Sequence, residues 1–333
     1  MSAASTSKSI DFNGDVAIVT GAAGSIGFAI AAALAQRGAS VLLNDSGASV
    51  QGEGTDATRA DRAVEDIRAT GGLAVANSLA VGTPQAAREI VDHATLTFGK
   101  VDILVNAAGV ARPCPFDEAT DEHLQQELQT NLLGPYAMMR AVWPGMRARG
   151  YGRILNVSSN AALGIGNNAS YATAKAGLLG LTLDAAAEGR SQGILVNALM
   201  PVAYSRMIEG IPDPAFVAWF REHMPAEKVA AASLYFLSRS SSSTGQIVSS
   251  GGGRLARLVF ATNQGFVGVT DPETVETHLG KALKITQIEA VGSSAAELAA
   301  YVKTFPFSGG SPELHEDAVV GAGKADRSTN RVR

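Results

Sequence analysis

A tyrosine and a lysine, Tyr171 and Lys175, stand four residues apart in the stretch "SYATAK". Residues at this spacing share one face of a helix, so both side chains can point into one cleft. An ammonium about 4 Å from a phenolate stabilises the ionised phenol by roughly 4 kcal/mol at an effective dielectric of about 20. The pair therefore predicts a tyrosine pKa lowered from about 10 toward neutrality, which suits a general base for an alcohol or a general acid for a ketone.

Two further polar positions complete a candidate catalytic set. The segment "NVSSNA" follows an apolar run, and a serine hydroxyl at the end of that strand can hydrogen-bond the reacting oxygen. Asn131, in "LQTNLLGPY", can order a water molecule that relays a proton from Lys175 to solvent. Taken singly, a tyrosine and a lysine at helical spacing indicate only a partly exposed helix face, so the order of the other motifs carries the interpretation.

A glycine-rich loop, "TGAAGSIG", joins the first apolar run to a helical stretch. Glycines at this place let the backbone turn tightly and approach a pyrophosphate, while free N–H groups at the helix N-terminus bind its negative charge. A glycine pattern alone is weak, because the chain has 36 glycines. The predicted dinucleotide contacts in this loop are Gly21, Ser25, Ile26 and Gly27.

Asp45 ends the second apolar run, "SVLLND", where an acid can accept hydrogen bonds from an adenosine ribose. A carboxylate there repels the extra phosphate of NADP, and no arginine stands in the glycine loop or directly after Asp45. The sequence thus predicts NAD, although Asp45 can also be read as a residue that starts a turn. Near the nicotinamide ribose we expect Lys175 and the small residues of "NAAG", which give Asn106, Ala107 and Gly109 as contacts.

The elements that position these residues alternate along the chain. Apolar runs predict strands over residues 16–20, 40–45, 73–78, 101–107, 152–159, 194–200 and 245–251, and helix-length segments separate them. This pattern predicts an α/β fold of the Rossmann type, a doubly wound parallel sheet, with a C-terminal helical extension. The Gly-, Ser- and Thr-rich segment 46–63 is predicted to wrap the cofactor edge. We expect a disordered N-terminus (1–10), a dinucleotide-binding catalytic domain (11–254), an extension with helices at 272–284 and 294–303, packed on the domain or on a partner subunit (255–305), and a flexible tail (306–333).

Composition excludes several classes of function. The chain of 333 residues is 46% hydrophobic and 17% charged, so it can bury a sizeable core. Its net charge of -4 offers no basic field for nucleic acid or anionic lipid, and we expect no membrane partner. The single cysteine, Cys114, cannot form an internal disulfide, and no residues have metal-ligand spacing. No signal peptide and no apolar run of bilayer length are seen, so we expect a cytoplasmic protein.

The motifs together resemble the short-chain dehydrogenase/reductase family from Val16 to about Gly253. "TGAAGSIG" is similar to its TGxxxGxG loop, "NAAG" to its NNAG segment, "TNLLG" to its asparagine helix and "YATAK" to its YxxxK motif. The resemblance implies a catalytic set of Asn131, Ser159, Tyr171 and Lys175. Because the loop before Tyr171 is one residue short, counting back selects Ser158, but we favour Ser159 because strand register constrains the forward count better.

Within that family, the segment 44–77 and the stretches "AAEGRSQGILVNALMPVAYSRM" and "GGRLARLVFATNQG" resemble the (3R)-hydroxyacyl-CoA dehydrogenase unit of peroxisomal multifunctional enzyme type 2. The resemblance implies nicotinamide contacts from Ala203 and Ser205 and, because Leu79 replaces an acid, adenine contacts from the backbone of Ala80 and Val81. It also implies a homodimer or homotetramer. The implied substrate is a hydrophobic secondary alcohol or ketone, either a (3R)-hydroxyacyl-CoA or a 17β-type hydroxysteroid. A non-catalytic NAD sensor or scaffold is the alternative from another class. Apolar residues expected around the substrate, which can also be plain packing, are Phe116, Leu163, Met207, Phe216, Trp219 and Phe220.

Overall fold

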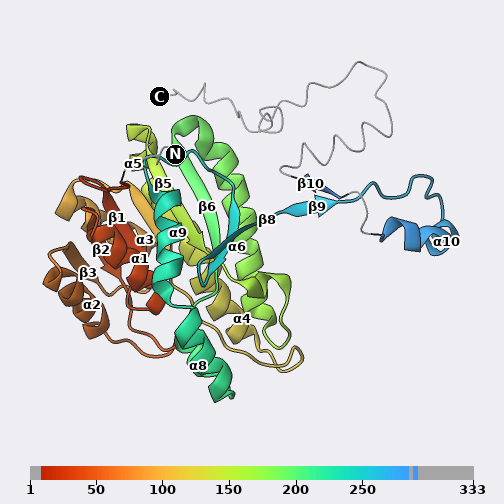
Figure 1. The fold of residues 1–333 in the computed structure, drawn as a ribbon, viewed down its shortest axis with the longest axis horizontal. Helices are drawn as coiled ribbons and strands as arrows, with labels where there is room; N and C mark the ends of the chain where they lie inside the picture. Colours follow the sequence, from red (N-terminus) through yellow and green to blue (C-terminus); the bar gives the residue numbers. More distant parts are fainter. Residues whose placement is uncertain (1–8, 285–287, 292–333) are drawn as a thin grey trace, which may run out of the picture. The chain divides into compact units, whose positions relative to one another are not determined.

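The computed structural model describes residues 9–284 and 288–291. It divides into two compact units, Met1–Leu258 and Val259–Arg333. The first unit holds an eight-stranded sheet in the order β3-β2-β1-β4-β5-β6-β7-β8 (Figure 1). Its strands are β1 (Val16–Thr20), β2 (Ser40–Asn44), β3 (Leu73–Asn77), β4 (Ile103–Asn106), β5 (Gly152–Val157), β6 (Ile194–Pro201), β7 (Ile247–Gly251) and β8 (Arg254–Leu258).

The seven predicted strands all form, and neighbouring members pair in parallel. The doubly wound prediction is therefore confirmed. Strand order reverses between β1 and β4, which opens a crevice at the carboxyl ends of these strands, where such folds bind ligands. The sequence pattern did not predict β8, which pairs antiparallel with β7 after a turn at Gly252 and Gly253. Two arginines interrupt the apolar residues of "RLARL", so the segment lacks the continuous apolar run that marks the other strands.

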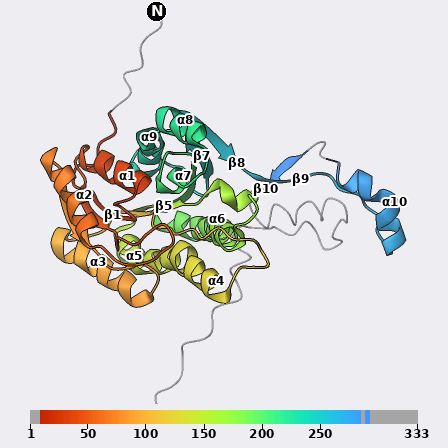
Figure 2. The ribbon, with the colours of Figure 1, turned by 90° about the horizontal axis from the view of Figure 1, so that it is seen from below.

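Helices cover both faces of the sheet. They are α1 (Ser25–Ala35), α2 (Thr58–Ala69), α3 (Pro84–Phe98), α4 (Asp121–Leu128), α5 (Gly134–Arg149), α6 (Ala169–Gly189), α7 (Arg206–Glu209), α8 (Pro214–His223) and α9 (Ala226–Leu237). A π-helical segment, η1 (Gln129–Leu133), joins α4 to α5, and short 3₁₀ segments are η2 (Asn160–Leu163) and η3 (Arg190–Gln192). Figure 2 shows α3 and α5 on one side of the sheet and α1 and α9 on the other.

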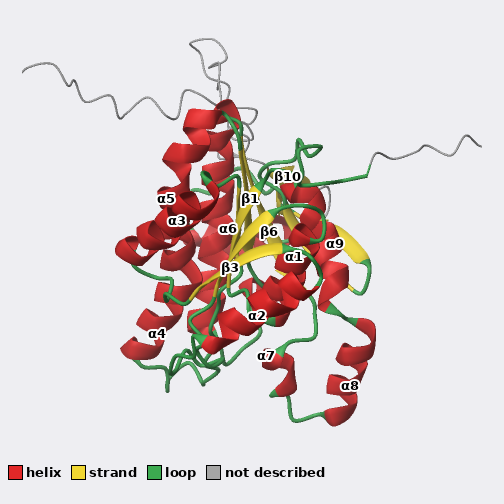
Figure 3. Cartoon of the chain, turned by 90° about the vertical axis from the view of Figure 1, so that its left-hand side faces the viewer, coloured by secondary structure: helices red, strands yellow, loops and turns green. Residues whose placement is uncertain are grey.

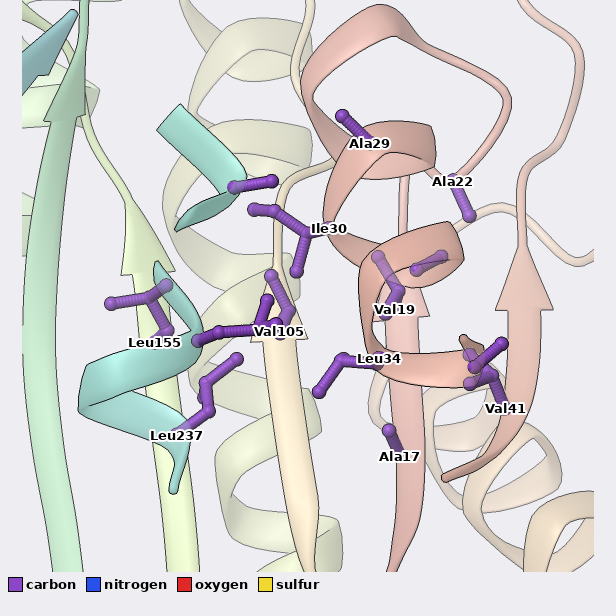
Figure 4. Packing of buried hydrophobic residues seen from close by; sticks show 14 of the residues in the cluster. Ala17, Val19, Ala22, Ala29, Ile30, Leu34, Val41, Val105, Leu155 and Leu237 are labelled. Atoms are coloured by element: carbon purple, nitrogen blue, oxygen red, sulfur yellow. The ribbon is translucent and has the colours of Figure 1, made fainter. Parts of the chain in front are cut away.

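Two apolar layers hold the helices on the sheet. On one face, Ile30 and Leu34 of α1 and Leu237 of α9 are fully buried over Val105 and Leu155 (Figure 4). On the other face, a second cluster joins α3 and α5 to the opposite side of the strands. Because both faces are covered, the strands read as continuous apolar runs. The sheet is thus a rigid scaffold, and the loops at the carboxyl ends of its strands can hold functional side chains. Helices α4, α7 and α8 lie at that end of the sheet (Figure 3).

The second unit is small in its described part. β9 (Phe260–Thr262) pairs antiparallel with β10 (Glu289–Val291). Helix α10 (Pro272–Ala282) begins after Asp271, whose side chain accepts a hydrogen bond from Thr274 N, and it corresponds to the helix expected at 272–284. The helix expected at 294–303 and the tail 306–333 lie outside the described residues, and the packing of segment 255–305 stays a prediction. None of the described helices is both long and apolar enough to cross a lipid bilayer.

Candidate active site

A cavity of about 570 Å³ lies in the first unit, lined from the ends of β1, β2, β4, β5 and β6. It brings together most residues that the sequence singled out. Of the predicted dinucleotide contacts, those in its wall are Gly21, Ser25, Ile26, Gly27, Asp45, Ala80, Val81, Ala107, Gly109, Tyr171, Lys175, Ala203 and Ser205, and Ser159 lines it too. Two predicted residues, Asn106 and Asn131, are buried outside the lining.

The glycine loop forms a cradle that side chains would fill. A Cβ on Gly21 would lie 2.6 Å from the Ala108 backbone, and one on Gly27 would lie 2.3 Å from Gly21 O. Helix α1 begins at Ser25 with no side-chain cap on its first N–H groups, and this end faces the cavity. Free N–H groups and the helix dipole make such a terminus attractive to a phosphate. The residues present therefore fit the pyrophosphate of a dinucleotide.

Asp45 is held by the backbone on two sides. Its Oδ2 accepts a hydrogen bond from Ala23 N at 2.9 Å, and its Oδ1 accepts one from Gly47 N at 2.8 Å. Each carboxylate oxygen can accept a further bond, so the side chain still offers acceptors to a ribose while it fixes the glycine loop.

Two arginines approach this acid from distant parts of the chain, and the sequence analysis did not identify them. Arg59 donates to Ala23 O at 3.2 Å and to Ala48 O at 3.3 Å. Arg206, the first residue of α7, lines the cavity and interacts electrostatically with Asp45 and Arg59. Burial lowers the pKa of the Arg206 guanidinium, and neighbouring Arg59 acts in the same direction. Arg206 stands inside the quoted "YSRM" stretch, so the signal for it was present in the sequence.

A strap, residues 46–55, closes one side of the cavity, as expected for the insert that follows the second strand. Its Val50 O accepts a hydrogen bond from Ala111 N at 2.9 Å. Arg112 donates to Gln51 O and pairs with Glu53 at 3.5 Å. These bonds tie the strap to the turn that follows β4. The cofactor end and the turn beside the reacting end are thus mechanically connected.

Tyr171 and Lys175 lie on α6 and are nearly inaccessible, with exposed fractions of 8% and 3%. Lys175 Nζ is 5.6 Å from the centre of the Tyr171 ring and donates a hydrogen bond to Val157 O at 2.9 Å. Small residues around the pair, together with buried Leu178 and Leu179, seat this helix closely against the sheet. The predicted pairing on one helix face is therefore present.

The protonation state differs from the sequence expectation. Burial raises the pKa of Tyr171 above its ordinary value, Ser159 acts against this rise, and the charge of Glu127 adds to it. Burial also lowers the pKa of Lys175 to about 8. The expectation of a lowered tyrosine pKa is thus wrong, because it counted the attraction between the two charges and omitted the cost of removing both from water.

The two candidate serines differ in what their hydroxyls do. Ser158 Oγ donates to Lys175 O at 2.8 Å, and its side chain is buried against α6. Ser159 interacts with the Tyr171 hydroxyl and accepts a hydrogen bond from Ala161 N at 3.1 Å. Ser159 therefore faces the reacting end, while Ser158 braces the helix that carries Lys175.

The two buried asparagines support the wall from behind. Asn131, on the π-helical segment, accepts from Val110 N at 3.1 Å and donates to Val110 O at 2.9 Å. A Cβ on Gly109 would lie 2.9 Å from Asn131 Oδ1 and 3.4 Å from Lys175 Nζ, so these three residues meet at one point. Asn106 instead donates to Asn156 Oδ1 at 2.8 Å, across β4 and β5. Its side chain ties two strands together and does not face the cavity.

The apolar residues expected around a substrate separate into two groups. Met207 and Phe220 line the cavity, and Phe220 packs edge-on against Phe216 and Trp219. Phe116 and Leu163 point away into solvent, with exposed fractions of 81% and 65%. The α7–α8 segment therefore supplies the apolar wall.

Comparison with known proteins agrees with this geometry. Residues 15–208 match the family model described as short chain dehydrogenase. The chain is 37% identical over 262 residues to the peroxisomal hydratase-dehydrogenase-epimerase of Neurospora crassa, covering 78% of this chain and 28% of that protein. It is 39% identical to the mouse (Mus musculus) peroxisomal multifunctional enzyme type 2, covering 74% of this chain and 33% of that protein. The crystal structure of a short chain dehydrogenase from Mycobacterium avium matches with a TM-score of 0.70 and 33% identity, over 82% of this chain and 95% of that chain. This chain thus spans about a third or less of the two multifunctional relatives.

Proposed function

The chain belongs to the short-chain dehydrogenase family, and from that premise we propose that it is an NAD-dependent oxidoreductase that interconverts a secondary alcohol and a ketone. One observation carries the proposal. Tyr171, Lys175 and Ser159 line the same cavity as the glycine cradle, whose helix has no side-chain cap on its first N–H groups. Groups that can exchange a proton and groups that can bind a dinucleotide thus line the same cavity, which supports the proposal.

Each residue has a distinct proposed role. Ser159 hydrogen-bonds the reacting oxygen, and Tyr171 exchanges the hydroxyl proton with it. Lys175, buried beside Tyr171, holds the ribose hydroxyls and provides positive charge when protonated. Asn131 fixes the backbone at Val110 on both sides and so keeps Gly109 against Lys175. Bound NAD supplies the acceptor for the hydride that leaves the carbinol carbon.

We propose NAD as the cofactor because of the position of the Asp45 carboxylate. Its carboxylate is held in the cavity wall by two backbone N–H groups, so it cannot easily turn away from the extra phosphate of NADP. Arg59 and Arg206 oppose this preference, but Arg59 is already bound to two carbonyl oxygens. Calorimetric titration of both nucleotides tests the choice, and tighter binding of NADP would reverse it.

The proposed substrate is a (3R)-hydroxyacyl-CoA, with a 17β-type hydroxysteroid as the alternative. The resemblance of the sequence to a (3R)-hydroxyacyl-CoA dehydrogenase unit and the apolar wall formed by Met207 and Phe220 support a lipid-like substrate. The experiment is NADH absorbance with a panel of hydroxyacyl-CoA thioesters and steroid alcohols, run on the wild type and on Tyr171→Phe. We expect turnover of one class and its loss in the variant, with NAD binding retained. Equal absorbance traces for both proteins across the panel would instead favour an NAD sensor.

We further propose that the chain forms a homodimer or homotetramer through α5 and α6. A groove of about 300 Å³ between these helices carries Tyr136, Arg140 and Arg147 on α5 and Asp184 and Glu188 on α6. Bases on one helix and acids on the other allow two copies to pair about a two-fold axis. Sedimentation of Tyr136→Glu tests this, because a charge at that half-exposed ring should dissociate the assembly.

A cytoplasmic location stays our proposal, although the relatives named above are peroxisomal, and cell fractionation decides it.

A further inference from the structure

A carboxylate is buried behind the cavity wall, close to the reacting end. Glu127 lies on α4 and is 1% exposed. Its Oε1 accepts a hydrogen bond from Arg112 N at 2.7 Å. The same carboxylate hydrogen-bonds Ser170, the residue directly before Tyr171. Burying a carboxylate costs several kcal/mol (order of magnitude) unless it is paired or protonated, so its position needs an explanation.

The charged and titratable groups around Tyr171 and Glu127 come from three elements: α6, α4 and the turn after β4. Tyr171 is faced by Lys175 on its own helix and by Glu127 from α4. Glu127 is faced by His123 on its own helix and by Arg112 from the turn after β4. Burial raises the pKa of Glu127, while the hydrogen bonds from Arg112 N and Ser170 lower it. The two bonds favour the ionised form, and a negative charge there opposes ionisation of Tyr171.

The contacts of Glu127 also reach the cofactor end. Glu127 accepts a hydrogen bond from the backbone N–H of Arg112, and the side chain of the same Arg112 donates to Gln51 O in the strap. Ala111, one residue earlier, donates to Val50 O of the strap. Glu127 is therefore connected to α6 through Ser170 and, through Ala111 and Arg112, to the strap beside the cavity.

We propose that Glu127 is a positioning residue that holds Ser170, next to Tyr171, on one side and the turn at Arg112, and through it the strap, on the other. Its negative charge adds to the burial that favours the neutral phenol of Tyr171. The inference rests on the proposed function. In ketone reduction, Tyr171 gives its phenolic proton to the carbonyl oxygen while the carbonyl carbon receives hydride from the reduced cofactor, so one C–H and one O–H bond replace the C=O π bond. The charge favours the acid role of Tyr171. It changes the pH dependence of both directions and leaves the equilibrium constant unchanged.

Two neutral variants separate the charge from the hydrogen bond. In Glu127→Gln the amide oxygen can still accept from Arg112 N, whereas Glu127→Leu removes both functions. Tyrosine ionisation is followed by stopped-flow absorbance after pH jumps, as the difference between each protein and its Tyr171→Phe counterpart, without cofactor or substrate. We expect the Tyr171 midpoint to move to lower pH in both variants. We expect the NAD dissociation constant to change less than about twofold in Glu127→Gln and to rise about tenfold in Glu127→Leu, as for a lost buried hydrogen bond.

Controls and contrary outcomes are distinct. Glu127→Asp restores the charge and should return the midpoint toward the wild-type value, and Glu122→Gln, an exposed acid on α4, should leave it unchanged. An unmoved midpoint in a folded neutral variant overturns the electrostatic role, and equal NAD affinities in the two neutral variants overturn the strap role. If one neutral variant does not fold, the other carries the charge test. If the midpoint of Tyr171 ionisation shifts in the neutral Glu127 variants but the wild type turns over no alcohol, the proposed function is contradicted and the assignment of Glu127 stands.

Discussion

The ammonium nitrogen of Lys175 lies 5.6 Å from the centre of the Tyr171 ring and donates to the carbonyl of Val157. Both side chains are almost fully buried, and burial disfavours the charged form of each. Burial therefore favours the neutral phenol of Tyr171 and makes Lys175 lose its proton more readily than an exposed lysine does.

The first prediction concerns the stability cost of Lys175. Its pKa is about 8 in the folded protein and 10.5 in the unfolded chain, so the unfolded state binds more protons between these values. Stability therefore rises with pH in this window. Relative to Lys175→Met, we expect the free energy of unfolding of the wild type to increase by roughly 1 to 2 kcal/mol between about pH 8 and pH 9.5. Urea denaturation at each pH measures this.

The control for that experiment is Lys228→Met, because Lys228 is an exposed lysine on α9. The free energy of unfolding of Lys228→Met should change with pH in parallel with that of the wild type between about pH 8 and pH 9.5. Parallel curves for Lys175→Met and the wild type would mean that Lys175 keeps its proton when buried.

The second prediction tests the glycine cradle. Gly21 has φ of 65°, and a Cβ there would lie 2.6 Å from the Ala108 backbone. Gly14 has a similar φ of 75° but nothing within 4 Å of the same atom. Gly14→Ala should thus lose about 1 kcal/mol of stability from backbone strain alone. Gly21→Ala should lose about 2 kcal/mol or more and bind NAD at least about tenfold more weakly, measured by thermal unfolding and calorimetry. Equal effects of the two variants would show that the loop can move aside.

The fold could be predicted from the sequence because its signals are local. Strands β1 to β7 are apolar runs, and the spacing of Tyr171 and Lys175 by itself places both on one helix face. Residues that act through long-range contact gave no such signal. Arg59 reaches Ala23, whose N–H binds Asp45, only after the strap folds back. Glu127 stands in a polar helix sequence, "DEHLQQEL", that looks solvent-exposed. The direction of the Tyr171 pKa also needed the burial of its surroundings, which spacing does not report.

The third prediction concerns Arg206 at the cavity wall. Its guanidinium is available to a dinucleotide phosphate, and Arg59 beside it is bound to carbonyl oxygens. Arg206→Leu should weaken NAD binding about fivefold to tenfold and reduce the dependence of affinity on salt concentration. Calorimetry at two ionic strengths measures both effects. Arg88→Leu, an exposed arginine on α3 that is absent from the cavity wall, should change neither. An unchanged affinity in Arg206→Leu would place this arginine outside the cofactor site.

The last prediction concerns an ion pair between a buried acid and a partly exposed arginine, directly before the amino end of β1. Asp15 is fully buried and pairs with Arg239, whose guanidinium also lies 4.4 Å from the centre of the Tyr151 ring. Arg239→Leu leaves the carboxylate unpaired, which costs about 3 kcal/mol near neutral pH.

The pH dependence of that loss follows from the Asp15 carboxyl group. Burial already raises its pKa, and removal of Arg239 raises it further because the attractive charge is gone. The folded variant therefore binds a proton more tightly than the unfolded chain, so its deficit in stability shrinks as pH falls toward the acid range. Urea unfolding of wild type and variant at pH values near 8 and 5 measures the deficit. Asp15→Asn combined with Arg239→Leu should remove the pH dependence, since no carboxylate is left to titrate. A deficit that stays constant with pH in Arg239→Leu would instead assign the loss to the contact with Tyr151.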